Sequence, residues 1–245
     1  MEDTGRRAVE RAIATMRANL GEPLTMDDLA RSALFSKFYF SRLFQQATGV
    51  SPARFLSAMR LAEAKRLLRC TPVTVTNISH QVGYSSVGTF STQFSIRVGT
   101  SPNSYRHFGS VDLAQNDDCG DPNLGIVRGN VVAPEGLPCW PIFVGLFPGR
   151  IPEGRPVRHT VLHTTGPYVL RDVPMGSWHL LAHLMEPGVS YDQVSHVGAL
   201  GSISISSGVV ARLADVRLRP VRSFDPPVLV ALPRPRIPAL AELTG

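Results

Sequence analysis

Two stretches of this 245-residue sequence repeat one another at an offset of 50 residues. The residues that recur are Ser36, Phe40, Ser41, Phe44, Gly49, Ser51 and Pro52, which return as Ser86, Phe90, Ser91, Phe94, Gly99, Ser101 and Pro102. Phe55 is matched by Tyr105 at the same offset. A repeat of this length is typical of a duplicated supersecondary unit. Capping residues and turn residues around each apolar stripe predict that the unit is helix-turn-helix.

The second helix of the first unit carries side chains suited to reading DNA. We expect it to begin after Ser36 and to end at Gly49. Its apolar residues have the i, i+3, i+4, i+7 spacing of a buried stripe: Phe40, Leu43, Phe44 and Ala47. The other face presents Phe38, Ser41, Arg42 and Gln45, with Lys37 at its side. Such donors and acceptors suit base edges and phosphates.

The second unit repeats this plan with a more neutral outer face. Gly83 suits a tight turn with positive φ, and the following helix is expected to open at Ser85 or Ser86. The outward residues of that helix are Gly88, Ser91, Thr92 and Ser95. Without Lys or Arg at its centre, this helix should bind DNA more weakly than the first one.

A third helix joins the two units. Ser51 and Pro52 form a typical start, and no helix breaker follows until about residue 69. Its 18 residues would be about 27 Å long at 1.5 Å per residue. Such a rod could hold two reading helices near the roughly 34 Å repeat of duplex DNA.

Charge and composition divide the chain into two halves. Residues 1–110 contain 14 Lys and Arg against 7 Asp and Glu, a net charge of +7, whereas the remainder carries −1. A basic half favours a polyanionic partner such as nucleic acid. Residues 111–245 hold 16 of the 20 Pro and 14 of the 21 Gly, which suits turns between strands. We therefore expect an all-α domain at 1–108, a polar linker at 109–123 and a second domain at 124–245.

Residues 24–108 resemble the DNA-binding domain of the AraC/XylS family of bacterial transcription regulators. The resemblance rests on four motifs in order: LARSALFSKFYFSRLFQQATGVSP, MRLAEAKRLL, ISHQVGYSSVGTFSTQF and GTSPNSYR. Members of the family place one recognition helix of each unit in successive major grooves. The resemblance assigns the first set of reading positions to Lys37, Phe38, Ser41 and Arg42, and the second to Val87, Gly88, Ser91 and Thr92.

The sequence departs from that family in two respects. Thr92, Ser95 and Ile96 stand where family members usually carry basic residues. Most members also carry this domain at the C-terminus, whereas here it comes first. The departures put base reading by the second unit in question, and the sensing domain of other members cannot be transferred to this chain.

The second half is predicted to be an antiparallel β-sandwich. Short apolar runs alternate with turn residues from Gly125 onwards, among them GIVRGNVV, PIFVGLF, HTVLHT, SWHLLAHLM, VVARLADVRL and VLVAL. The string GPYVLRDVPMGSWHLLAH, residues 166–183, resembles the transthyretin-like sandwich called the carboxypeptidase regulatory-like domain. We place that resemblance at about residues 124–220. It implies an architecture and leaves the ligand open.

Few residues in this half are candidates for metal binding or catalysis. His179 and His183 would share one face of a strand, as would His159 and His163, and could hold a metal if the strands pair. A solvated strand face is the commoner reason for such alternation. Cys139 is followed by Trp140 where alkyl-accepting repair proteins have His, so we expect a small buried apolar role for it. No catalytic residue and no cofactor is predicted.

The sequence predicts a cytoplasmic, sequence-specific transcription regulator that binds double-stranded DNA. Only three cysteines occur, and no apolar run approaches the roughly 20 residues that a membrane span needs. RNA polymerase, an unidentified small-molecule effector and a homodimer are the further partners considered. Two oligomeric states are considered: a homodimer formed through the second half, and a monomer whose selectivity comes from contacts with RNA polymerase. Two alternatives stay open for the second half: a DNA-tethered enzyme or metal sensor, and a structural platform for partners.

Overall fold

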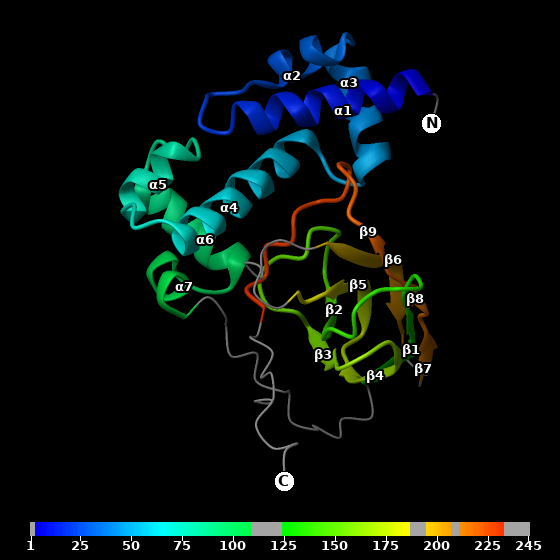
Figure 1. The fold of residues 1–245 in the computed structure, drawn as a ribbon. Helices are drawn as coiled ribbons and strands as arrows, with labels where there is room; N and C mark the ends of the chain where they lie inside the picture. The colour runs from blue at the N-terminus through cyan, green and yellow to red at the C-terminus, as the bar shows by residue number, and fades with distance from the viewer. Residues whose placement is uncertain (1–2, 109–123, 187–194, 207–210, 233–245) are drawn as a thin grey trace.

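The computed structural model describes residues 3–108, 124–186, 195–206 and 211–232, which form a helical half followed by a β-rich half (Figure 1). The helices are α1 (Asp3–Ala18), α2 (Met26–Ala33), α3 (Lys37–Thr48), α4 (Pro52–Cys70), α5 (Val75–Gln81), α6 (Val87–Val98) and α7 (Pro102–Phe108). Helices α2 and α3 form the first predicted unit, and α5 and α6 form the second. Helix α4 lies between them as the predicted rod, and its 19 residues give it a length of about 28 Å.

The predicted helix caps are confirmed, and they repeat from one unit to the other. Ser36 Oγ accepts the backbone N–H of Tyr39 at 3.4 Å, and Ser86 Oγ accepts that of Thr89 at 3.4 Å. Gly49 and Gly99 end the two helices with φ angles of 77° and 92°, in the left-handed region that glycine tolerates. The repeat in the sequence therefore encodes the same start and the same end for α3 and α6.

The aromatic residues of the repeat form two matching rows in the helical core. Phe40, Phe44 and Phe55 have successive ring-centroid distances of 5.6 and 5.3 Å. Their counterparts Phe90, Phe94 and Tyr105 have distances of 5.6 and 5.7 Å. All six side chains are buried. Each row ties the second helix of its unit to the helix that follows, which fixes the orientation of α3 and α6.

The first turn of the first unit is further stabilised by a reciprocal cap. Thr25 Oγ1 accepts the backbone N–H of Asp28 at 3.2 Å, and the Asp28 carboxylate accepts the Thr25 N–H at 3.0 Å. Hydrogen bonds from the hydroxyl and backbone N–H of Thr25 lower the pKa of Asp28. Helix α2 therefore begins at Met26, directly after this cap.

Two sheets face one another in the β-rich half and share one apolar core. The strands are β1 (Gly125–Val132), β2 (Ile142–Phe147), β3 (Arg158–Leu162), β4 (Gly166–Val173), β5 (Gly176–Leu184), β6 (His196–Ile205), β7 (Ala211–Leu213), β8 (Val216–Arg217) and β9 (Arg219–Pro220). One sheet has the order β4-β1-β7 with β8 also paired to β1, and the other has the order β3-β2-β5-β6-β9. Their common core contains side chains from both sheets, such as Val127, Leu170, Val144 and Ala182.

Two details of the predicted sandwich are wrong. The sheets are not purely antiparallel, because β1 pairs in parallel with both β7 and β8. The apolar run 228–232 is not a strand; its residues pack alternately against the helical core and against the outer face of β2 and β5. Both errors share a reason: apolar alternation predicts an extended, half-buried segment, but it does not specify the partner or its direction.

The final described segment, residues 221–232, joins the two halves. Figure 1 shows it rising from β9 to the region where α3 meets α4, below α1, and then returning alongside α4. Its backbone pairs with both halves: the N–H of Ala231 donates to Val98 O at 3.0 Å, and the N–H groups of Leu229 and Val230 donate to Pro152 O. Leu229 and Ala231 belong to the helical core, while Val230 and Leu232 cover the outer face of β2 and β5. All residues of β2 are therefore buried, since apolar groups cover both faces of its sheet.

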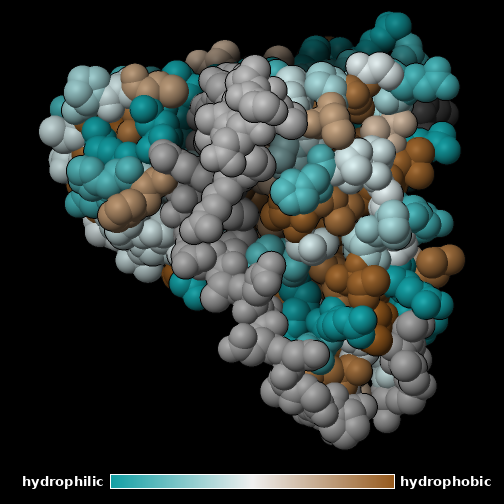
Figure 2. Space-filling model, turned by 60° about the horizontal axis from the view of Figure 1, so that its bottom comes forward, coloured by the Kyte–Doolittle hydropathy of each residue, from teal (hydrophilic) through white to brown (hydrophobic). Residues whose placement is uncertain are grey.

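The predicted domain boundaries remain a proposal, because the predicted linker 109–123 lies outside the described residues. Figure 2 shows the β-rich half with apolar patches scattered between hydrophilic side chains. Exposed large apolar residues there include Val169, Met175 and Leu213. No helix in the described ranges combines the length and apolar character needed to cross a membrane.

Candidate nucleic-acid interface

Helix α3 presents the predicted reading residues on one exposed face. Phe38 is 81% exposed, and Arg42 and Gln45 are exposed as well, whereas Phe40 and Phe44 on the other side are buried. Ser41 lies half-buried between them, and Ser36 forms the N-terminal cap. This arrangement leaves a cation, an amide and an aromatic ring free to meet a ligand from outside.

Two charged contacts position the basic residues of this face. Lys37 Nζ lies 3.1 Å from the Asp27 carboxylate, which ties the start of α3 to α2. The guanidinium of Arg42 lies over the ring of Tyr39 at 5.5 Å from its centroid. Tyr39 was not among the predicted reading residues. The i, i+3 spacing of an aromatic residue and an arginine on one helix is the signal that could have found it.

Helix α6 presents a smaller and uncharged face. Gly88 and Thr92 are exposed, Val87 and Ser91 are half-buried, and Ser86 forms the cap. Ser95 does not project a free hydroxyl, because its Oγ donates to Ser91 O at 2.7 Å. Ile96, 64% exposed, adds an apolar side chain to the same helix. The α6 face therefore offers van der Waals surface and one threonine hydroxyl where α3 offers charge.

The β-rich half contacts the helical half away from these faces. The loop 148–157 meets the C-terminal ends of both reading helices: the N–H of Gly154 donates to Arg97 O at 2.6 Å, and Arg150 lies against Gly49. Glu153 forms ion pairs with Arg54 at the start of α4 and with Arg97, the latter at 3.5 Å. The N-terminal and central residues of α3 and α6 stay exposed.

Buried Lys65 anchors the returning segment to α4. Its Nζ donates to Val228 O at 3.2 Å and to Val230 O at 3.3 Å, and lies 5.7 Å from the centroid of the Tyr105 ring. A buried ammonium needs such acceptors, since its desolvation is otherwise costly. No short-range pattern predicts this contact, because the carbonyl groups that accept hydrogen bonds from Lys65 lie more than 160 residues away in the chain.

The two histidine pairs lie at strands that are not neighbours, because β2 stands between β3 and β5. His179 and His183 are four positions apart on β5, which places their Cα atoms about 13 Å apart. His183 packs against Phe143 at 5.6 Å between centroids, and His159 stacks on that same ring at 5.8 Å. Burial lowers the pKa of His159. His163 follows the end of β3. Within the described residues, no three His, Cys, Asp or Glu side chains gather as metal ligands.

The expectation for Cys139 is wrong. It is exposed, and its thiol lies 3.9 Å from His163 O. The segment around Cys139 lies outside the strands, and its neighbours Leu137 and Trp140 pack against the core while the cysteine faces outward.

Comparison with known proteins identifies the helical half. Residues 29–107 match the family model described as a helix-turn-helix domain. The lactose operon transcription activator of Staphylococcus xylosus is 30% identical over 107 residues, which are 44% of this chain and 38% of the activator. The transposon Tn10 TetD protein of Escherichia coli is 36% identical over 88 residues, 36% of this chain and 64% of TetD. The chain thus spans less than two thirds of the length of these relatives.

A similar solved structure is the C-terminal domain of AraT, a response regulator from Geobacillus stearothermophilus. It is 33% identical, with 41% of this chain and 84% of that domain covered and a TM-score of 0.40. The matched part of the chain is similar to a helix-turn-helix domain, and the relatives it matches include proteins named as transcription activators.

Proposed function

We propose that this chain is a DNA-binding transcription regulator whose helical half reads two neighbouring stretches of one duplex. One observation carries the proposal: two helix-turn-helix units share one skeleton and both leave the outer face of the second helix exposed. Helix-turn-helix proteins place that second helix in the major groove. The relatives named as transcription regulators support the same role.

Charge supports double-stranded DNA as the partner. The net charge of +7 on residues 1–110 favours a polyanion, and Lys37 and Arg42 are both exposed on α3. Arginine makes bidentate contacts to guanine in the major groove, and the polar Gln45 can meet adenine. We assign base reading to Phe38, Ser41, Arg42 and Gln45 in the first unit and a lesser part to Val87, Gly88, Ser91 and Thr92 in the second.

For the β-rich half we propose a transthyretin-like β-sandwich with a binding role and no catalytic one. The string that carries the resemblance spans β4, a two-residue turn and β5, and this turn takes the chain from one sheet to the other. Trp178 Nε1 donates to Pro174 O at 2.9 Å across the turn. The half would sense a ligand, join two copies of the chain or contact RNA polymerase.

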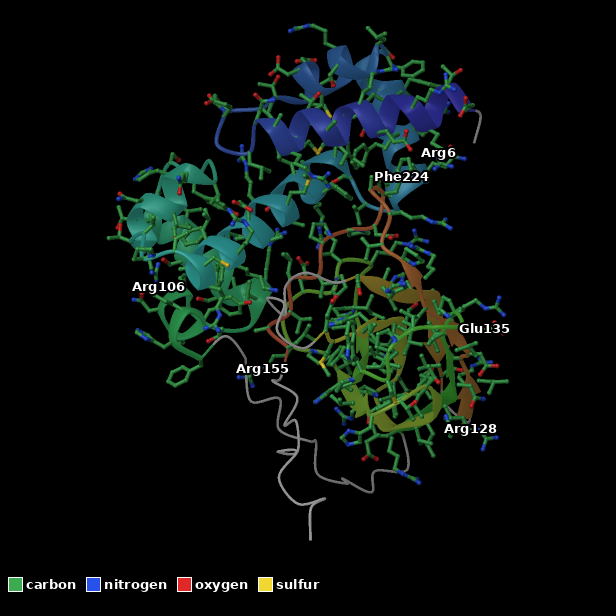
Figure 3. The ribbon with its side chains drawn as sticks, viewed as in Figure 1. Arg6, Arg106, Arg128, Glu135, Arg155 and Phe224 are labelled. Carbon is green, nitrogen blue, oxygen red and sulfur yellow. The ribbon has the colours of Figure 1, made fainter. Side chains whose placement is uncertain are left out.

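Selection of bound DNA by the full chain tests the regulator. Fragmented genomic DNA is incubated with the protein, and the bound fragments are sequenced. We expect enrichment of a motif with two parts about one helical turn apart, and loss of that enrichment in Arg42→Ala. Arg128→Ala is the matched control, because Arg128 is exposed on β1, on the far side of the β-rich half (Figure 3). Retention of fragments without any common motif would contradict the proposal.

Sedimentation of the full chain, alone and with bound DNA, distinguishes the dimer from the monomer. The full chain is needed because Leu229 and Ala231 of the second half are buried in the helical core. A cut between the halves would expose that apolar surface to water and favour artificial association.

A further inference from the structure

A cavity of about 620 Å³ lies where the two halves of the molecule meet. Its walls come from α1, the C-terminal end of α3, strands β5 and β6, and residues 219–226. Small-molecule sites usually have volumes of roughly 300 to 1,000 Å³ and lie preferentially between domains. Figure 3 shows Arg6 and Phe224, two of the lining residues, near one another where the C-terminal segment reaches α1.

The cavity is strongly basic. Its lining includes the side chains of four arginines, Arg6, Arg150, Arg219 and Arg222, together with His179. The one acidic residue in the lining is Asp225. Its carboxylate accepts two hydrogen bonds of 2.7 Å from the guanidinium of Arg219 and one of 2.7 Å from the Arg222 N–H. The negative charge of Asp225 is therefore engaged by Arg219 and by the backbone.

Two of the arginines keep donors for a ligand. Arg6 is held by Glu10 at 3.2 Å and lies over the Phe224 ring. By contrast, no ion pair among the described residues includes the guanidinium of Arg150 or of Arg222. Guanidinium groups bind carboxylate and phosphate through paired hydrogen bonds.

The side chain of Arg150 lies against the end of helix α3. A β-carbon built on Gly49 would lie 2.1 Å from Arg150 Nη1, so the arginine side chain occupies the space that the glycine leaves. The C-terminal end of a helix favours a nearby cation. Burial and the neighbouring Arg150 lower the pKa of His179. The site thus combines two exposed guanidinium groups with an imidazole ring.

We propose that this cavity binds a small organic anion, a metabolite with a carboxylate or phosphate group, through Arg150, Arg222 and His179. The charged group meets the two guanidinium groups, while Phe147, Leu181 and Phe224 cover the organic part. The volume exceeds what an inorganic ion fills, which favours a ligand with a carbon skeleton. Because residues of both halves form the walls, an occupant stabilises their packing.

The phosphates of bound DNA offer the same chemistry from a second source. The geometry favours the free anion. The cavity is lined by Ala47 and Thr48 at the C-terminal end of α3, whereas Lys37 and Phe38 stand at its N-terminal end. About 13 Å along the helix axis separates the cavity from these two residues of the proposed DNA face. An adjoining hollow of about 360 Å³ extends to Gln45, so both sources are included in the test.

The test is calorimetric titration of the full chain with citrate, with glucose 6-phosphate and with glucose, all at constant ionic strength. We expect each of the two anions to bind one chain with a Kd of about 1 mM or tighter, and glucose to give no binding heat. Arg150→Gln and Arg222→Gln should each weaken anion binding about tenfold, while Arg128→Gln leaves it unchanged. The double variant Arg150→Lys with Arg222→Lys keeps the charge but loses the paired hydrogen bonds of the guanidinium groups, so it should bind the anions more weakly than the unchanged chain.

Thermal unfolding of each variant shows that it is folded before the titration is interpreted. Absence of binding by both anions, or equal weakening in Arg128→Gln, would overturn the proposal. A repeat titration with bound duplex DNA distinguishes the sources: retained anion binding supports a free metabolite, whereas its abolition assigns the cavity to the DNA backbone and overturns the proposal. The titration detects the anion directly, so its outcome is independent of whether the chain regulates transcription.

Discussion

The two helix-turn-helix units have the same skeleton but different outer faces. Serine caps, left-handed glycines and aromatic rows recur at matching positions with nearly equal distances. On the exposed side, Arg42 and Gln45 of α3 have Thr92 and Ser95 as counterparts on α6. The comparison shows that the repeat preserves the residues that fold each unit, whereas most of the exposed residues on the outer faces have diverged. The first unit should therefore dominate DNA reading while both contribute alike to stability.

The largest effect is expected from truncating the matched aromatic cores. Phe44→Ala and Phe94→Ala should each lower the free energy of unfolding by about 3 to 5 kcal/mol, because both side chains are fully buried and leave a cavity. Urea denaturation of the two variants measures this. If one substitution cost little and the other the full amount, the two skeletons would not be equivalent.

Truncation on the outer faces should separate the two units. Arg42→Ala should weaken specific DNA binding by about 1 to 3 kcal/mol, the usual effect of losing a good base contact. Thr92→Ala, at the matching position, should cost less, since it removes a neutral hydroxyl. Gel-shift titration at fixed salt measures both, with Arg128→Ala as the control. Unchanged affinity and specificity in Arg42→Ala would remove Arg42 from the reading face.

A smaller contrast is expected at the two glycines that end the reading helices. Gly49→Ala and Gly99→Ala should each cost about 1 kcal/mol in stability, because alanine disfavours the left-handed conformation. Gly49→Ala should cost more, since its β-carbon collides with Arg150, whereas the nearest atom at Gly99 is 3.4 Å away. Thermal unfolding compares the pair. A greater loss in Gly99→Ala would show that Arg150 moves away freely.

Local rules were sufficient to predict the helical half. Ser36, Ser51 and Ser86 act as caps at the predicted positions, and the apolar spacing of α3 placed Phe40 and Phe44 in the core. Such features depend on residues close in sequence, and the 50-residue repeat supplied each prediction twice. The exposed faces followed from the same periodicity, although DNA reading by their residues stays a prediction.

Non-local contacts could not be predicted in the same way. The parallel pairing of β1 with β7 joins segments some 85 residues apart, and no short-range pattern fixes the direction of such a pair. Nothing in the sequence around Lys65 distinguishes it from an exposed helical lysine. In the structure it is buried, and its ammonium group donates hydrogen bonds to carbonyl groups of the C-terminal segment. The basic cavity combines arginines from α1, the loop after β2 and the segment after β6, so it too is invisible in the linear order.

The two units have matching folds, but we expect them to contribute unequally to DNA recognition. Titration against a series of mutated binding sites tests this expectation. The full chain is titrated against its selected duplex, then against duplexes with the first or the second half-site scrambled. We expect a clearly greater loss of affinity when the half-site under α3 is scrambled than when the half-site under α6 is scrambled. Hydroxyl-radical footprinting with a cleavage probe attached at Tyr39 assigns each half-site to its helix. Equal losses from both half-sites, or a greater loss under α6, would contradict it.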